Sequence, residues 1–174
     1  MEQTTHLQQI LHFLKEIGIP VVETTLPTDT FLPGLDLGAN CVLVDFNQLK
    51  YPGDLLHEAG HLAVTTPEQR NAIGTDQLQQ PFPDDGEEIV TLLWSYAAAV
   101  HIGLPLEVVF HPDGYKGQSD WLIELFESKT YSGLPLLEWM GLTLGPDLAL
   151  AEGKQAFPVM QHWLRVSISR YEFN

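Results

Sequence analysis

Two histidines and a glutamate fall within one short run, His57-Glu58-Ala59-Gly60-His61. Residues four apart lie on the same face of an α-helix, so both imidazoles can point at one metal ion. Glu58 directly follows the first histidine, which places its carboxylate beside such an ion, where it can take a proton from a zinc-bound water. This HExxH spacing therefore predicts a zinc site with its own general base. The alternative is an amphipathic helix that carries two histidines and a solvated glutamate at its edge.

The flanking residues predict the helix that this geometry needs, over about 54–65. Asp54 stands at the expected N-cap, and Pro67 follows the expected end. A glycine in mid-helix is less stable than alanine by about 1 kcal/mol, so we expect another element to approach the backbone of Gly60 closely. The side that we expect to be buried consists of Leu55, Leu56, Ala59, Leu62 and Ala63.

A third metal ligand has to come from another part of the chain, because two histidines alone bind zinc weakly. Glu87 and Glu88 open a second helix, expected over about 86–102 and capped by Asp84 or Asp85. We favour Glu88, whose helix face continues through small and polar side chains, whereas Glu87 lies on the side of bulky residues. Glu87 is the alternate ligand. A further alternative is that both acids only interact with the helix dipole.

Peptide hydrolysis also needs a hydrogen-bond donor for the developing oxyanion. The side chains available for this role are those of Tyr96, His101, His111 and Tyr115. Tyr96 falls on an apolar stripe with Ile89, Leu93 and Val100, which favours a place in the core. His111 stands in a turn, where a surface role or a contact behind the metal ligands competes with catalysis. Tyr96 and His111 are kept as possible transition-state or supporting residues.

The remaining pattern predicts an α+β fold with a small mixed sheet and a mostly helical C-terminal part. A helix is expected over 4–17 and strands over 20–25 and 41–46, separated by a loop or hairpin connection at 26–40. Residues 67–86 are expected to be an irregular connection that forms one wall of a cleft. Further short helices are expected at 106–110, 119–128 and 134–140. Because we find no repeat, low-complexity tract or linker, we expect a single domain over 1–174.

Composition limits the partners. The chain has 8 Lys and Arg against 23 Asp and Glu, a formal charge of −15 that would repel nucleic acid and anionic membranes. We find no apolar run long enough for a membrane span and no signal peptide, so a cytoplasmic location is expected. The single cysteine, Cys41, lies in an apolar strand pattern and does not suggest a catalytic thiol. The sequence does not predict an oligomeric state.

The motif and the downstream glutamate resemble the gluzincin group of zinc metallopeptidases. Over residues 1–103, the order of elements is most similar to the ImmA/IrrE-like peptidases. The resemblance implies a zincin-like domain in which His57, His61 and Glu88 hold Zn²⁺ and Glu58 acts as general base and acid on a peptide or protein substrate. The competing hypothesis is a zinc-binding regulatory or protein-interaction module that keeps the metal site without significant peptidase turnover.

Overall fold

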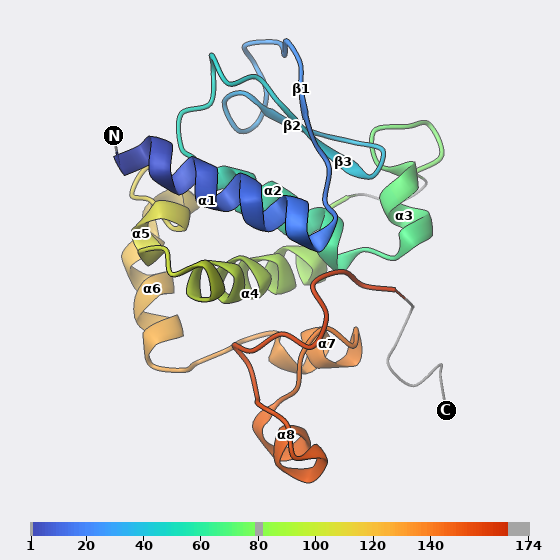
Figure 1. Ribbon diagram of the computed structural model, residues 1–174, viewed down its shortest axis with the longest axis vertical. Coiled ribbons are helices and arrows are strands. Elements are labelled where there is room, and N and C mark those ends of the chain that lie inside the picture. The colour runs from blue at the N-terminus through green and yellow to red at the C-terminus, as the bar shows by residue number, and fades with distance from the viewer. Residues whose placement is uncertain (1, 79–81, 167–174) are drawn as a thin grey trace.

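The chain folds into helices and one small sheet (Figure 1). This computed structural model describes residues 2–78 and 82–166. Within these ranges the sheet has three strands and there are eight α-helices, which confirms the predicted α+β class. No helix in these ranges is long and apolar enough to cross a membrane. The elements are α1 (Glu2–Ile17), β1 (Val21–Glu23), β2 (Leu35–Gly38), β3 (Cys41–Val44), α2 (Asp54–Val64), α3 (Pro67–Ala72), α4 (Asp85–Ile102), α5 (Leu106–Val109), the 3-10 turn η1 (Tyr115–Gly117), α6 (Ser119–Glu127), α7 (Leu134–Trp139) and α8 (Pro146–Glu152).

The sheet has the order β1-β3-β2, with β1 parallel and β2 antiparallel to the central strand β3. Val42 pairs with Val21 on one side and with Leu37 on the other, and its side chain is fully buried. The strands β1 and β3 were expected. Of the two alternatives for 26–40, a loop or a hairpin connection, the structure shows the hairpin, because β2 lies inside this range and pairs antiparallel with β3. The alternation of β2 spans only four residues, too few for the pattern to stand out among prolines and glycines.

The helix that carries the motif, α2, lies between the sheet and α4 (Figure 1). A Cβ atom built on Gly60 would lie 2.9 Å from Cγ2 of Thr91 and 3.2 Å from the ring of Trp94. This confirms the expected close approach at Gly60 and identifies α4 as the approaching element. The absence of a side chain at this position lets the two helices pack closely directly beside the motif.

The apolar stripe predicted along α4 was only half right. Leu93 and Tyr96 are buried, but Ile89 and Val100 are 43% and 45% exposed, and Trp94 is fully buried instead. Helices α1, α2, α5 and α7 all pack against α4. Because neighbours cover several of its sides, most residues in the middle of the helix are buried, and a single-stripe pattern does not apply.

The observed N-terminus of α4 agrees with the sequence prediction, whereas those of α2 and α3 differ from it. Asp84 caps α4 as expected. At α2 the N-cap is Gly53, and Asp54 is the first helical residue with its carboxylate turned to another partner. The connection after α2 was expected to be irregular, but part of it forms α3, which Thr66 starts through a capping box with Gln69.

A buried arginine fixes the C-terminal end of α2. The guanidinium of Arg70 donates to the carbonyls of Leu62 at 2.8 Å, Thr65 at 2.9 Å and Arg165 at 2.8 Å. The backbone N–H of Arg165 in turn donates to the carbonyl of Ala63 at 2.9 Å. The end of the motif helix is therefore tied to a segment about a hundred residues later in the chain.

We expect Arg70→Met to lower the free energy of unfolding by about 2–4 kcal/mol, because it leaves buried carbonyls without donors. Within the described residues, the ion pair of the exposed Lys154 is with a neighbour in sequence, Glu152, at 2.8 Å. The control Lys154→Met should therefore cost less than about 1 kcal/mol. Urea denaturation measures both. Equal effects of the two substitutions would contradict the role of Arg70.

Candidate metal centre

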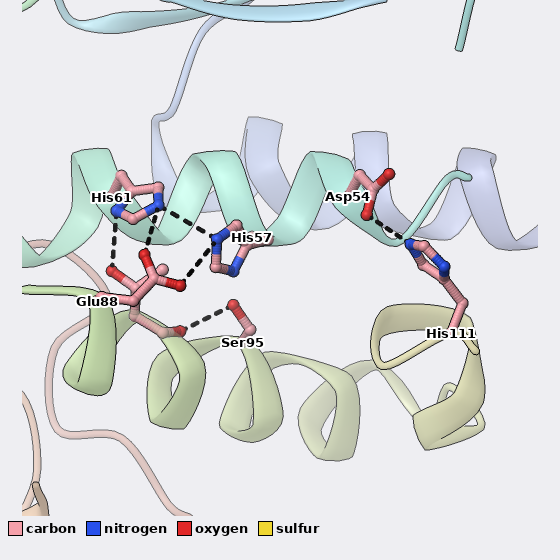
Figure 2. A network of polar contacts seen from close by, with 7 residues as sticks. Asp54, His57, His61, Glu88, Ser95 and His111 are labelled. Atoms are coloured by element: carbon pink, nitrogen blue, oxygen red, sulfur yellow. Dashed lines mark hydrogen bonds and ion pairs between the residues drawn. The ribbon is translucent and has the colours of Figure 1, made fainter. Parts of the chain in front are cut away.

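The structure brings His57 and His61 of α2 together with Glu88 of α4 (Figure 2). The two Nε2 atoms are 3.2 Å apart. Oε1 of Glu88 lies 3.5 Å from Nε2 of His57, and Oε2 lies 3.4 Å from Nε2 of His61. One ligand atom from each of the three residues lies within 4.8 Å of the others, so a single metal ion fits among them.

The outer nitrogen of His61 is held by α4. Nδ1 of His61 lies 3.3 Å from Oγ1 of Thr91, so Nδ1 can carry the ring proton and leave Nε2 free to bind a metal. Ser95 donates to the backbone carbonyl of Thr91 at 2.8 Å. Thr91 also touches α2 at Gly60, and the residue that packs the helices together is therefore the one that orients a histidine.

Burial keeps both histidines uncharged. It lowers the pKa of His57 to about 4, and burial together with the neighbouring His57 lowers the pKa of His61 to about 3. A neutral imidazole has the free electron pair that a metal ligand needs. Burial raises the pKa of Glu88, although its side chain is 42% exposed and one side of the cluster is therefore open to solvent.

Glu58 follows His57 on α2 and lies in an acidic environment. Burial, and then the charges of Asp54, Asp36 and Glu88, raise the pKa of Glu58 to about 8. Glu58 also lines a cavity of about 290 Å³ formed with β2 and the loop before it. A cation bound next to this carboxylate would offset the repulsion and favour its ionised form, which is the form that a general base requires.

Glu87, the alternate ligand, is engaged elsewhere. Its carboxylate accepts the backbone N–H of Asp84 at 3.0 Å, and the carboxylate of Asp84 accepts the N–H of Glu87 at 2.7 Å. This capping box starts α4 and turns Glu87 away from the histidines. Of the two neighbouring acids, the structure brings Glu88 to the cluster.

The four candidates for an oxyanion donor lie in different places. The ring of Tyr96 is stacked on Phe126 in the core, with 4.8 Å between centroids. This agrees with the predicted core position of Tyr96 and places it away from the histidines. The ring of His101 packs on other aromatic rings, Phe13 and Trp163. His111 contacts Asp54 at the start of α2 (Figure 2). Only Tyr115, among these four, has its ring against a histidine of the motif.

Replacing Glu58 by glutamine should change how the stability of the metal-free protein depends on pH. Between pH 4.5 and about 8, folded Glu58 holds a proton that the unfolded chain has released, so wild-type stability falls as the pH rises through this window. The loss is at most about 1.4 kcal/mol per pH unit. The advantage of Glu58→Gln in urea denaturation should therefore grow across the window. A constant advantage would contradict the raised pKa.

The resemblance to gluzincins and to ImmA/IrrE-like peptidases stays a prediction. It is carried by the motif at residues 57–61 and by Glu88, whose position beside the two histidines is now described. No protein-family model, no curated protein and no solved structure matches this chain.

Proposed function

We propose that this chain is a zinc-dependent metallopeptidase. The observation that supports this most strongly is the meeting of His57, His61 and Glu88, with Glu58 next in sequence to the first histidine. Two histidines and a carboxylate are a known ligand set of catalytic zinc, which keeps a fourth coordination position for water or substrate. The neutral histidines and the partly exposed Glu88 suit this role.

Glu58 is the general base and acid of the proposed reaction. When bound, zinc lowers the pKa of a coordinated water toward about 7 and polarises a carbonyl group. Glu58 accepts a proton from the attacking water and passes it to the amine that leaves when the peptide bond breaks. With a cation bound beside it, the Glu58 carboxylate is favoured in its ionised form, which can accept this proton.

The surroundings of Glu58 suit an extended peptide. Strand β2 is at the edge of the sheet, and Asp36 on this strand is close enough to raise the pKa of Glu58. An edge strand can pair with a peptide through backbone hydrogen bonds, while nearby pockets accept its side chains. The cavity beside Glu58 is bordered by Phe31, which is 96% exposed and could contact such a side chain.

Metal analysis tests the ligand set. Purified protein from zinc-replete cells should contain about one zinc per chain. His57→Ala and Glu88→Gln should lose most of it, because each removes one of three ligands. The matched control Glu87→Gln should retain it, since Glu87 is engaged in the cap of α4. Zinc-free wild-type protein, or loss of zinc in Glu87→Gln but not in Glu88→Gln, would contradict the proposed centre.

Peptide cleavage tests the role of Glu58. Glu58→Gln should keep its zinc, because Glu58 is not one of the three residues whose ligand atoms cluster. It should cleave a broad peptide library at least ~10²-fold more slowly than the wild type, as expected for loss of a general base. Mass spectrometry of the products gives the rates. Zinc-loaded wild-type protein that cleaves no peptide would instead favour the regulatory or protein-interaction module.

A further inference from the structure

The proposed reaction also requires a hydrogen-bond donor to the carbonyl oxygen as this atom becomes negatively charged. Neither the motif nor Glu88 supplies such a donor. We propose that the hydroxyl of Tyr115 is this donor, and that the Asp54–His111 pair is the positioning device that holds the loop of Tyr115 against α2. This inference rests on the proposed peptidase function. It adds a group from outside the two helices of the metal centre.

Tyr115 is placed beside the metal ligands. Its ring meets the ring of His57 edge-on, with 5.8 Å between centroids and 86° between planes. The ring of Tyr115 also packs on Phe110, a fully buried core residue, with 5.4 Å between centroids. The ring of Tyr115 thus contacts both the core and a predicted zinc ligand.

The side chain of Tyr115 offers a hydrogen-bond donor next to the predicted ligand His57. A tyrosine hydroxyl is ordinarily protonated at neutral pH, so it can donate a hydrogen bond without adding another negative charge. These are the properties required of a donor to an oxyanion.

The backbone at Tyr115 is unusual. Tyr115 has φ = +54° and Lys116 has φ = +55°, in the left-handed region that side chains larger than glycine rarely adopt. Such conformations persist only where surrounding contacts enforce them, and they are enriched at functional sites. Here the strained turn carries the one tyrosine, among the described residues, whose ring contacts a histidine of the motif.

The contact that enforces this turn starts on α2 itself. His111 Nε2 lies 2.9 Å from Oδ1 of Asp54, and the two residues are only 6% and 4% exposed. Ser119 donates to the backbone carbonyl of His111 at 2.6 Å and fixes it from the other side. Asp54 lies one helical turn before His57 and Glu58, so the loop is anchored to the same helix that carries the motif.

A second layer of contacts supports the pair. The ring of Tyr51 is stacked on His111 with centroids 3.7 Å apart, and its hydroxyl bonds to Asp113. Lys50 pairs with the same carboxylate at 3.2 Å. The residues just before α2 therefore hold both His111 and Asp113, which precede Tyr115 in the loop. This arrangement explains why His111 is buried although it is not one of the proposed metal ligands.

Two ligands test the donor without requiring turnover. On zinc-loaded full-length protein, a phosphinic dipeptide presents a tetrahedral oxyanion, whereas a mercaptoacyl dipeptide with the same side chains binds through sulfur. Calorimetry should show that Tyr115→Phe weakens the phosphinic ligand about 10- to 100-fold, the value of one hydrogen bond to a charged group. The mercaptoacyl ligand should bind equally well to both proteins. In parallel, kcat should fall while KM stays within about threefold.

The positioning role is tested by coupling. His111→Ala and the conservative Asp54→Asn should each weaken the phosphinic ligand and lower kcat in the wild-type background. Neither should weaken the phosphinic ligand further in the Tyr115→Phe background, because the group they position is already absent. The affinity of the mercaptoacyl ligand reports whether the variants still fold around zinc. Weakening of both ligands together, or additive effects, would overturn the positioning role.

The outcomes separate this inference from the proposed function. If the wild type binds both ligands and Tyr115→Phe binds the phosphinic ligand as tightly, Tyr115 is not the donor, but the zinc peptidase proposal stands. If zinc-loaded wild type binds neither ligand, the metal has no open position, and the peptidase proposal fails together with this inference.

Discussion

The close packing of α2 on α4 is the constraint on which the candidate metal centre depends. At Gly60 the side chain of Thr91 comes within contact distance of the α2 backbone, and one turn away the same packing brings Glu88 to the histidines. A bulkier residue at position 60 would meet Thr91 and Trp94 of α4, so it would push apart the two helices that carry the candidate ligands. The fold and the site therefore share a single interface, and Gly60 inside the motif serves both.

Several carboxylates lie close together at the interface between α2 and α4. Glu58 lies near Asp54, Asp36 and Glu88, and each of these raises its pKa. In the metal-free protein these groups repel one another in a region partly shielded from water, which opposes folding. A divalent cation bound by the histidines and Glu88 would reverse the sign of the local field. We therefore expect metal binding to stabilise the fold as well as to enable chemistry, since the same charges govern both.

The sequence predicted what is local. The motif, its helix, the cap of α4 and the preference for Glu88 all follow from spacing within one or two helical turns. It could not predict features that depend on distant contacts. The short strand β2 exists because it pairs with β3, and the burial of Trp94 follows from neighbours on several sides of α4. Asp54 looked like an N-cap, but a histidine 57 residues later takes its carboxylate.

Tyr115 shows where sequence reasoning stops and geometry begins. Four side chains could have served as the donor, and the sequence pattern kept Tyr96 and His111 as possible supporting residues. The apolar stripe favoured a core position for Tyr96, and nothing in the local pattern singled out Tyr115. The structure separates them because the ring of Tyr115 alone reaches His57, through a backbone conformation that no propensity favours. A strained turn of this kind is stable only if other contacts hold it, and the buried Asp54–His111 pair provides them. On the proposal that Tyr115 is the donor, His111 supports the loop of this tyrosine and takes no direct part in catalysis.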